Sequence, residues 1–200
     1  MFTVQKFLIA FSIAQILCPI ADAVIIKGTT SYRDDAFADA ASSTGSPLIY
    51  GGALSISDAL SGSDLTTGVE FVGAETVQID FIDNTIKNIA GNDLVIFEYG
   101  ANPETISLTV GSMESMSIVY ASVFSFQEGG TNINEIRVDL NDFGIAMGNS
   151  VSSIFIKVGD SAHKPEISGA ASLEPIPEPG QYALIFGLAI LGYLLLRRKA

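Results

Sequence analysis

The sequence predicts an all-β protein, an antiparallel β-sandwich, on three observations. Apolar residues in the central region alternate with polar ones at period two, whereas a helix repeats every 3.6 residues. Clusters of Gly, Asn, Asp and Pro separate these runs at spacings of about 10 to 20 residues. No long amphipathic helix pattern competes with them. Because periodicity does not decide how a sheet closes, an up-and-down barrel is the structural alternative.

The alternating runs each present one apolar face. In Thr76–Phe81 the inward residues are Val77, Ile79 and Phe81. Three more runs alternate in the same way: Thr105–Val110 (Ile106, Leu108 and Val110 inward), Glu135–Leu140 (Ile136, Val138 and Leu140 inward) and Ser153–Val158 (Ile154, Ile156 and Val158 inward). Two further β-rich runs are Ser117–Phe126 and Leu94–Phe97. The second is apolar on both faces, which predicts a strand in the middle of a sheet.

The N-terminal residues Met1–Ala23 predict a secretory signal peptide. A single cation, Lys6, precedes the apolar run Phe7–Leu17, which is too short for a membrane anchor that needs roughly 20 residues. Ala21 and Ala23 form the A-x-A pattern that signal peptidase accepts. We therefore expect cleavage after Ala23.

The one cysteine, Cys18, lies inside the segment to be removed. The mature chain would then have no thiol, which excludes disulfides, thiol catalysis and cysteine-ligated metal. Attachment of a lipid at Cys18 is disfavoured, because Leu17 stands where lipoproteins need a small residue.

The C-terminal residues predict a short transmembrane helix. Tyr182–Leu196 is fifteen residues without a charge, or about 22 Å of helix, against a hydrocarbon layer of about 30 Å. Arg197, Arg198 and Lys199 follow at once and keep the terminus on the cytoplasmic side. A buried core helix is the alternative, but it would need a polar face. Three prolines in the preceding Pro175–Gly180 predict a stiff, extended stalk.

Taken together, Pro177–Glu178–Pro179, the apolar helix and the Arg-Arg-Lys end resemble the PEP-CTERM sorting signal of Gram-negative bacteria. The resemblance covers residues 175–200. It implies that an exosortase in the inner membrane recognises the tripeptide and processes the tail, so that the helix is a transient address before release to the cell surface or extracellular matrix. Family members often have Ser or Thr after the second proline. Here Gly180–Gln181 intervenes, and Tyr182 supplies the usual aromatic residue.

The body of the chain, Val24–Glu174, has the 151 residues of a single domain and is strongly acidic. Six Lys and Arg residues against twenty Asp and Glu residues give it a formal charge of −14. Such a surface cannot neutralise phosphates, which argues against nucleic-acid binding and against anionic lipid. It favours solubility outside the cell and attracts divalent cations.

Three stretches of this body, Phe81–Asn84, Gly91–Glu98 and Ile154–Asp160, resemble the ectodomain common in PEP-CTERM and related bacterial surface proteins. In those proteins a Gly-x-Asp strand ending in Val-Phe-Glu recurs ahead of a second apolar strand. The resemblance implies a jelly-roll sandwich of the galactose-binding type, a fold used mostly for glycan or surface recognition. A fold is only a starting point for assigning a function.

Calcium is the metal that this composition can hold, because it takes carboxylate and amide oxygens in loops. The first-choice ligands are Asp34, Asp35 and Asp39. Two other acidic turns contain Asp83 and Asn84, and Asp139, Asn141 and Asp142. The alternative is that these side chains cap backbone groups. Zinc sites need several Cys or His ligands, so with His163 as the single histidine and no mature cysteine we do not expect zinc.

No catalytic constellation is recognisable, so we expect a protein that is not an enzyme. Asp93 and Glu98 flank the apolar strand, and glycoside hydrolysis needs two carboxyls about 5 to 9.5 Å apart, but twenty acids make chance pairs inevitable. His163 fits a solvated loop. The expected function is a non-enzymatic, exported surface or matrix protein associated with extracellular polysaccharide. The alternative is a glycan-binding module, with or without calcium.

Overall fold

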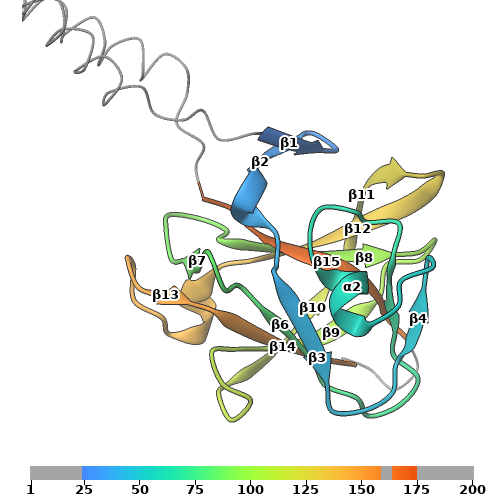
Figure 1. The fold of residues 1–200 in the computed structure, drawn as a ribbon. Helices are drawn as coiled ribbons and strands as arrows, with labels where there is room; N and C mark the ends of the chain where they lie inside the picture. The colour runs from blue at the N-terminus through green and yellow to red at the C-terminus, as the bar shows by residue number, and fades with distance from the viewer. Residues whose placement is uncertain (1–23, 159–163, 175–200) are drawn as a thin grey trace, which may run out of the picture.

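In the computed structural model, which describes residues 24–158 and 164–174, every strand pair is antiparallel (Figure 1). The larger sheet has six strands, in the order β11 (Val123–Glu128), β12 (Thr131–Val138), β8 (Leu94–Tyr99), β15 (Glu166–Ser172), β5 (Gly68–Glu70) and β4 (Leu48–Tyr50). The other has five, in the order β10 (Ser117–Ala121), β9 (Thr105–Val110), β14 (Ser153–Val158), β6 (Val77–Asp80) and β3 (Ala40–Ser43). Two small pairs join β1 (Val24–Lys27) to β2 (Thr30–Arg33) and β7 (Ile86–Lys87) to β13 (Ser150–Val151). Both large sheets are open, as in a sandwich.

The larger core is built from both large sheets. Val77 and Ile79 of β6 belong to the same buried cluster as Leu94 and Ile96 of β8. Every inward residue predicted from the alternation is buried or packed against this cluster. The short helix α2 (Ile56–Leu60) adds its own apolar residues to the core and packs against β3, β5 and β15. The alternation is therefore a correct guide to the inner faces.

A second, smaller core covers the other face of β8. Val95 and Phe97 pack there with Tyr32 of β2, Phe37 and Leu65. The Tyr32 ring lies 5.4 Å from that of Phe37 and 5.9 Å from that of Phe97, measured between centroids, and burial raises the pKa of Tyr32 to about 12. This core explains why the predicted central strand is apolar on both faces. β8 lies between β12 and β15, as predicted.

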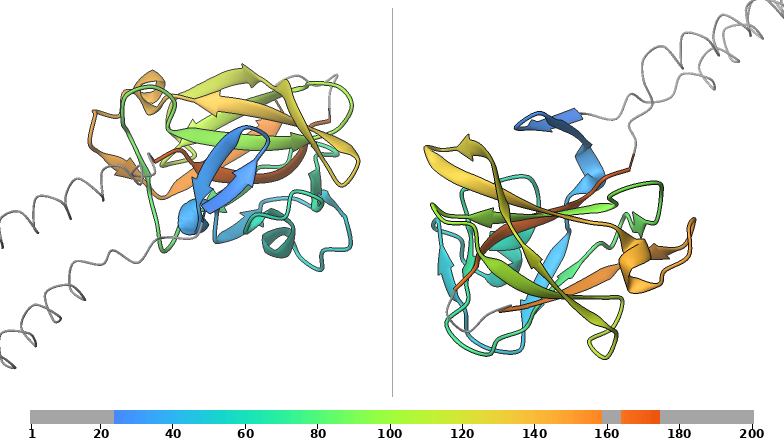
Figure 2. Two further views of the ribbon diagram at one scale, coloured as in Figure 1. Left: turned by 90° about the horizontal axis from the view of Figure 1, so that it is seen from above. Right: turned by 180° about the vertical axis from the view of Figure 1, so that it is seen from behind.

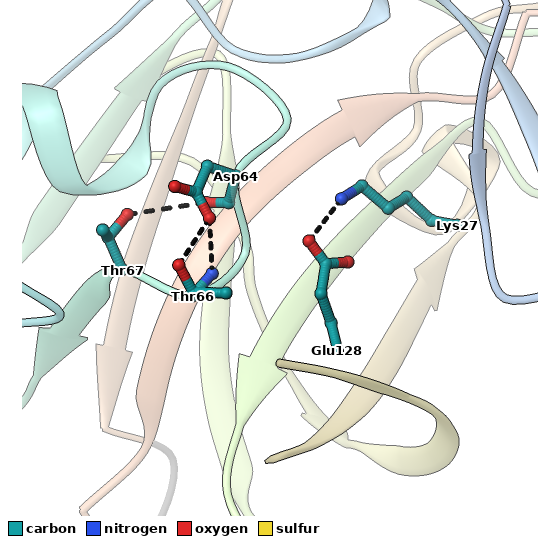
Figure 3. Close-up of polar contacts among 5 residues, drawn as sticks. All are labelled: Lys27, Asp64, Thr66, Thr67 and Glu128. Carbon is teal, nitrogen blue, oxygen red and sulfur yellow. Dashed lines mark hydrogen bonds and ion pairs between the residues drawn. The ribbon is translucent and has the colours of Figure 1, made fainter. Parts of the chain in front are cut away.

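Figure 3 shows an ion pair between the β1–β2 hairpin and β11, and hydrogen bonds within the loop before β5. The Lys27 ammonium at the end of β1 lies 2.5 Å from a carboxylate oxygen of Glu128, the last residue of β11. In the loop before β5, Asp64 accepts hydrogen bonds from the backbone N–H and the hydroxyl of Thr66, at 2.9 and 2.6 Å. These two bonds lower the pKa of Asp64, and Lys27 adds to the effect. Thr67 donates its hydroxyl to the carbonyl oxygen of Ala59 in α2, at 3.0 Å.

The β-rich run Ser117–Phe126 forms two strands, β10 and β11, which lie in different sheets. The break falls at Ser122, which is 3% exposed. Its backbone N–H donates to the Glu104 carbonyl at 2.9 Å, and its hydroxyl donates to the Glu98 carboxylate at 2.8 Å. The chain therefore passes from one sheet to the other at Ser122, and alternation cannot reveal such a crossing.

The central strand β15 carries no sequence signal and was not predicted. It contains Gly169, Ala170 and Ala171, which have low strand propensity, yet most of its residues are buried. At the bulge between Ile167 and Gly169, a Cβ on Gly169 would lie 3.4 Å from the side chain of Leu65. Small residues suit this strand because it lies between β8 and β5, and the second core lies against Ala171.

The predicted signal peptide (1–23), the sorting signal (175–200) and His163 lie outside the described residues. Within the two described ranges, no helix is both long and apolar enough to cross a membrane.

We predict that Phe97→Ala destabilises the fold by about 3 to 5 kcal/mol, the usual cost of removing a buried phenyl ring. Phe97 is fully buried, and its ring lies 6.2 Å from that of Phe37 and 6.5 Å from that of Phe126. Ile82→Ala, at a side chain that is 74% exposed, is the control and should change stability by less than about 0.5 kcal/mol. Urea unfolding followed by circular dichroism measures both. Equal midpoints for the two variants would contradict the second core.

Candidate functional site

The predicted calcium ligands lie between β2 and β3. Asp34 and Asp35 begin the short 3-10 helix η1 (Asp34–Ala36), and Asp39 immediately precedes β3. A carboxylate oxygen of Asp35 accepts a hydrogen bond from Arg33 at 2.7 Å. One oxygen of Asp39 accepts from two successive backbone N–H groups in the loop after β6, at 2.5 and 3.2 Å. Asp35 and Asp39 therefore already have partners within the chain.

One further predicted acid, Asp83, joins this group. Local desolvation and then the charges of Asp39 and Asp35 raise the pKa of Asp83. A cavity of about 230 Å³ is lined by Asp83, Asp35, Arg33 and Glu174, among others. The Arg33 guanidinium bonds Asp35 and, at 3.2 Å, Glu174. Arg33 is thus a built-in cation for these carboxylates.

In the third acidic turn, Asp139 and Asp142 already accept hydrogen bonds from groups within the chain. One oxygen of Asp139 accepts from the Asn141 backbone N–H at 2.8 Å and caps the 3-10 helix η2 (Leu140–Phe143). Asp142 accepts a hydrogen bond from the Tyr120 hydroxyl at 3.0 Å. Over residues 24–158 and 164–174, no group of three or more His, Cys, Asp or Glu side chains is arranged to hold a metal ion. A calcium site at Asp34, Asp35 and Asp39 stays a prediction.

The two acids that flank β8 have different surroundings. Asp93, just before the strand, is 1% exposed and accepts from the backbone N–H groups of Ile89 (2.7 Å) and Leu140 (2.8 Å). Glu98 lies near the other end of the strand, about 17 Å away at 3.4 Å per residue. That separation exceeds the 5 to 9.5 Å of a glycosidase pair. Asp93 is a structural carboxylate, and these two acids do not form a pair.

Glu98 is the acid with the most unusual environment. It is 1% exposed, and one of its oxygens accepts from the Ser122 hydroxyl at 2.8 Å and from the Asn134 amide at 2.6 Å. Asn134 stands opposite Glu98 in the β12–β8 register. Burial raises the pKa of Glu98 even though these two hydrogen bonds act in the opposite direction. A buried carboxyl with a raised pKa is a candidate functional group.

Two more carboxylates line a small cavity with Glu98. This cavity, of about 170 Å³, is formed by Glu98, Glu104 and Glu166 together with the turn that follows β8. A Cβ on Gly100 in that turn would lie 3.6 Å from an oxygen of Glu98 and 3.8 Å from an oxygen of Glu166. Burial raises the pKa of Glu166, and the charges of Glu70 and Glu104 raise it further. We call Glu98, Glu104 and Glu166 the carboxylate cluster.

An aromatic pair lies beside the carboxylate cluster. The ring centroids of Tyr50 and Tyr99 are 4.9 Å apart. Burial and the nearby charge of Glu166 raise the pKa of Tyr50 above its ordinary value. The Tyr99 hydroxyl is within 2.9 Å of the Thr131 hydroxyl. Carboxylates that accept hydrogen bonds, next to aromatic rings, are groups that can bind a polyhydroxylated ligand.

Sequence reasoning identified Glu98 in this cluster and missed the rest. Glu166 belongs to the unpredicted strand β15, and Tyr50 to the three-residue strand β4. Glu104 directly precedes a predicted strand and flanks the same turn as Glu98, but no pattern in the sequence indicates that this turn brings the two carboxylates to one cavity. No family model matches the chain, and no curated protein matches it.

We predict that the domain becomes more stable as the pH falls from about 8 towards 5. A carboxyl whose pKa is raised in the folded state stabilises the fold below its ordinary pKa, about 4.3 for Glu, and loses that contribution as the pH rises through the raised value. Burial raises the pKa of both Glu98 and Glu166. Glu98→Gln keeps an oxygen for Ser122 and Asn134 but removes the charge. It should raise the melting temperature at pH 8 by about 2 to 4 °C per kcal/mol gained, and should flatten the pH dependence.

The matched control is Glu114→Gln, because Glu114 lies exposed in the turn between β9 and β10. Its pH profile should follow that of the unmodified chain. Identical profiles for Glu98→Gln and the unmodified chain would show that Glu98 does not titrate in this range.

Proposed function

We propose that this chain is an exported, non-enzymatic protein of the bacterial surface or extracellular matrix, sorted by an exosortase. The observation that carries the proposal is the order of its terminal segments. A segment with the pattern of a signal peptide precedes the domain, and Pro177–Glu178–Pro179, the apolar run Tyr182–Leu196 and the Arg-Arg-Lys end follow it. Each segment is ordinary by itself, but the four in this order match the needs of export followed by sorting.

The arrangement of the domain's ends supports the proposal. Glu174, the last described residue, bonds Arg33 at the end of β2. In Figures 1 and 2 the β1–β2 hairpin and the end of β15 lie on the same side of the domain. The chain thus enters and leaves on one side, so that a proline-rich stalk would hold the opposite side away from the membrane.

We predict that exported protein begins at Val24 and lacks Arg197, Arg198 and Lys199. Mass spectrometry of intact protein from the cell surface or medium measures both ends. Glu178→Ala should leave the tail attached and the protein in the inner membrane, because it removes the one charge of the tripeptide. Gln181→Ala, outside the tripeptide, should be processed normally. A mature protein that starts at Met1 or keeps the basic end would contradict the proposal.

A glycan-binding module is the second candidate function, and the carboxylate cluster favours it. Glu98, Glu104 and Glu166 line one small cavity, with Tyr50 and Tyr99 beside it. Carboxylates accept hydrogen bonds from sugar hydroxyls, and aromatic side chains pack on sugar rings. The resemblance to the galactose-binding type of jelly roll leads to the same candidate. Any calcium in such a module would bind through the acids around Asp35 and Asp39.

A glycan array probed with the purified protein separates the two functions. A glycan-binding module predicts saturable binding to one sugar class, weakened about tenfold or more by Glu166→Gln and unaffected by Glu114→Gln. A matrix role predicts no selective binding, together with loss of cell aggregation when the gene is deleted.

The array is repeated in millimolar calcium and in chelator. Calcium-dependent binding that Asp35→Asn removes would establish the predicted metal site, and an effect reproduced by sodium chloride at equal ionic strength would reject it.

A further inference from the structure

β10 is an open edge of the five-stranded sheet. Among the described residues its only strand partner is β9, and the pairing runs without a bulge from Ser117 to Ala121. Ile118 and Tyr120 stand opposite Leu108 and Ile106, which are buried in the core, so Ser117, Val119 and Ala121 share the outer face.

The backbone of β10 directs hydrogen-bonding groups towards the open side. The Ser122 N–H donates to the Glu104 carbonyl, which identifies these opposed residues as a hydrogen-bonded pair. Such pairs alternate along an antiparallel ladder. Residues 118 and 120 therefore bond β9, and residues 117, 119 and 121 present their N–H and C=O groups to the free edge. That row is a template for another strand.

The other sheet edges carry protection that β10 lacks. β3 has four residues and β4 has three, and α2 packs against both. β11 has a bulge between Phe124 and Phe126, and the ion pair of Glu128 with Lys27 brings the β1–β2 hairpin against its end. Short strands, bulges and covering elements are the usual protection of an edge.

The sequence around β10 also lacks the charges and prolines that guard exposed edges. Residues 115–127 contain no Asp, Glu, Lys, Arg or Pro. Two large apolar side chains in and just before the strand are more than half exposed: Met116 (55%) and Val119 (60%). An uncharged, apolar edge is the surface on which soluble proteins associate.

A second copy of the chain is the occupant that the charge distribution favours. The domain carries −14, so two copies repel each other wherever their acidic surfaces meet. The thirteen-residue run 115–127, which includes β10 and most of β11, adds no charge of its own to that repulsion. An antiparallel strand also complements itself about a two-fold axis, which needs no second kind of surface.

We propose that β10 of one chain pairs antiparallel with β10 of a second, which joins the two five-stranded sheets into one continuous sheet. The register that pairs all five residues sets Val119 opposite Val119, and Ser117 opposite Ala121. The pairing itself does not depend on export. Its use in cross-linking a matrix rests on the proposed function. One strand pair buries less than a standard interface of about 1,600 Å², so association is weak and rises with concentration.

Sedimentation velocity of the full chain in a nonionic detergent tests the pairing. The unmodified chain should shift towards twice its mass as the concentration rises. Val119→Pro removes a backbone donor of the free edge and leaves the β9 bonds in place, and we expect it to raise the half-association concentration at least tenfold. Val119→Thr keeps the donor and the strand propensity and should associate as before. A circular dichroism melt verifies that each variant folds.

Single cysteines in a Cys18→Ser background test the register. Cα atoms of a hydrogen-bonded antiparallel pair are about 5.5 Å apart, which suits a disulfide. Val119→Cys should cross-link to itself under mild oxidation. Ser117→Cys and Ala121→Cys should each remain mostly monomeric alone and cross-link when mixed. A chain that stays monomeric would overturn the proposal. Association that Val119→Pro leaves unchanged would also overturn it if the cross-linking does not depend on the position of the cysteine. Both outcomes hold whether or not the protein is exported.

Discussion

Strand β8 needs cover on both of its faces, and the rest of the domain is organised around that need. Leu94 and Ile96 belong to the core between the large sheets, and Val95 and Phe97 belong to the second core. A strand apolar on both sides is stable only between two layers. The five-stranded sheet is one layer, and the segment from Tyr32 to Phe37 with the loop before β5 supplies the other. The hairpin is thus part of the fold and not an appendage.

Two carboxylates near the ends of β8, those of Asp93 and Glu98, are also buried, and they differ in their hydrogen-bond donors. Asp93 accepts hydrogen bonds from two backbone N–H groups and so links the two loops that contain these donors. Both hydrogen bonds to Glu98 come from side chains and reach the same carboxylate oxygen. Glu104 and Glu166 line the same cavity. A buried charge with few donors is costly. Burial therefore raises the pKa of Glu98, so protonation of its carboxyl relieves this cost.

The edge strands of the two large sheets are not equally protected, and β10 has the least protection. Helix α2 packs against β3 and β4, which are edge strands of the two large sheets, and the β1–β2 hairpin lies against the end of β11. Among the described residues, the free edge of β10 pairs with no other strand, and β10 itself contains no acid. Electrostatic repulsion and an uncharged edge act together here. Repulsion keeps copies apart over most of the surface, and the free edge decides where they can meet.

Local patterns in the sequence determined the strand class, the inner faces of β6, β9 and β14, and the central position of β8, because alternation reports burial one residue at a time. The predicted signal peptide and sorting signal rest on equally local patterns and stay predictions. The tertiary structure alone decided where β15 lies, since Gly169 and its alanines have no pattern of their own and are buried by their neighbours. It also decided the break at Ser122 and the meeting of Glu98 with Glu104 and Glu166. The contacts of Glu98 with Ser122 and Glu166 join residues far apart in the chain, and a strand's own pattern carries no information about which strand will lie beside it.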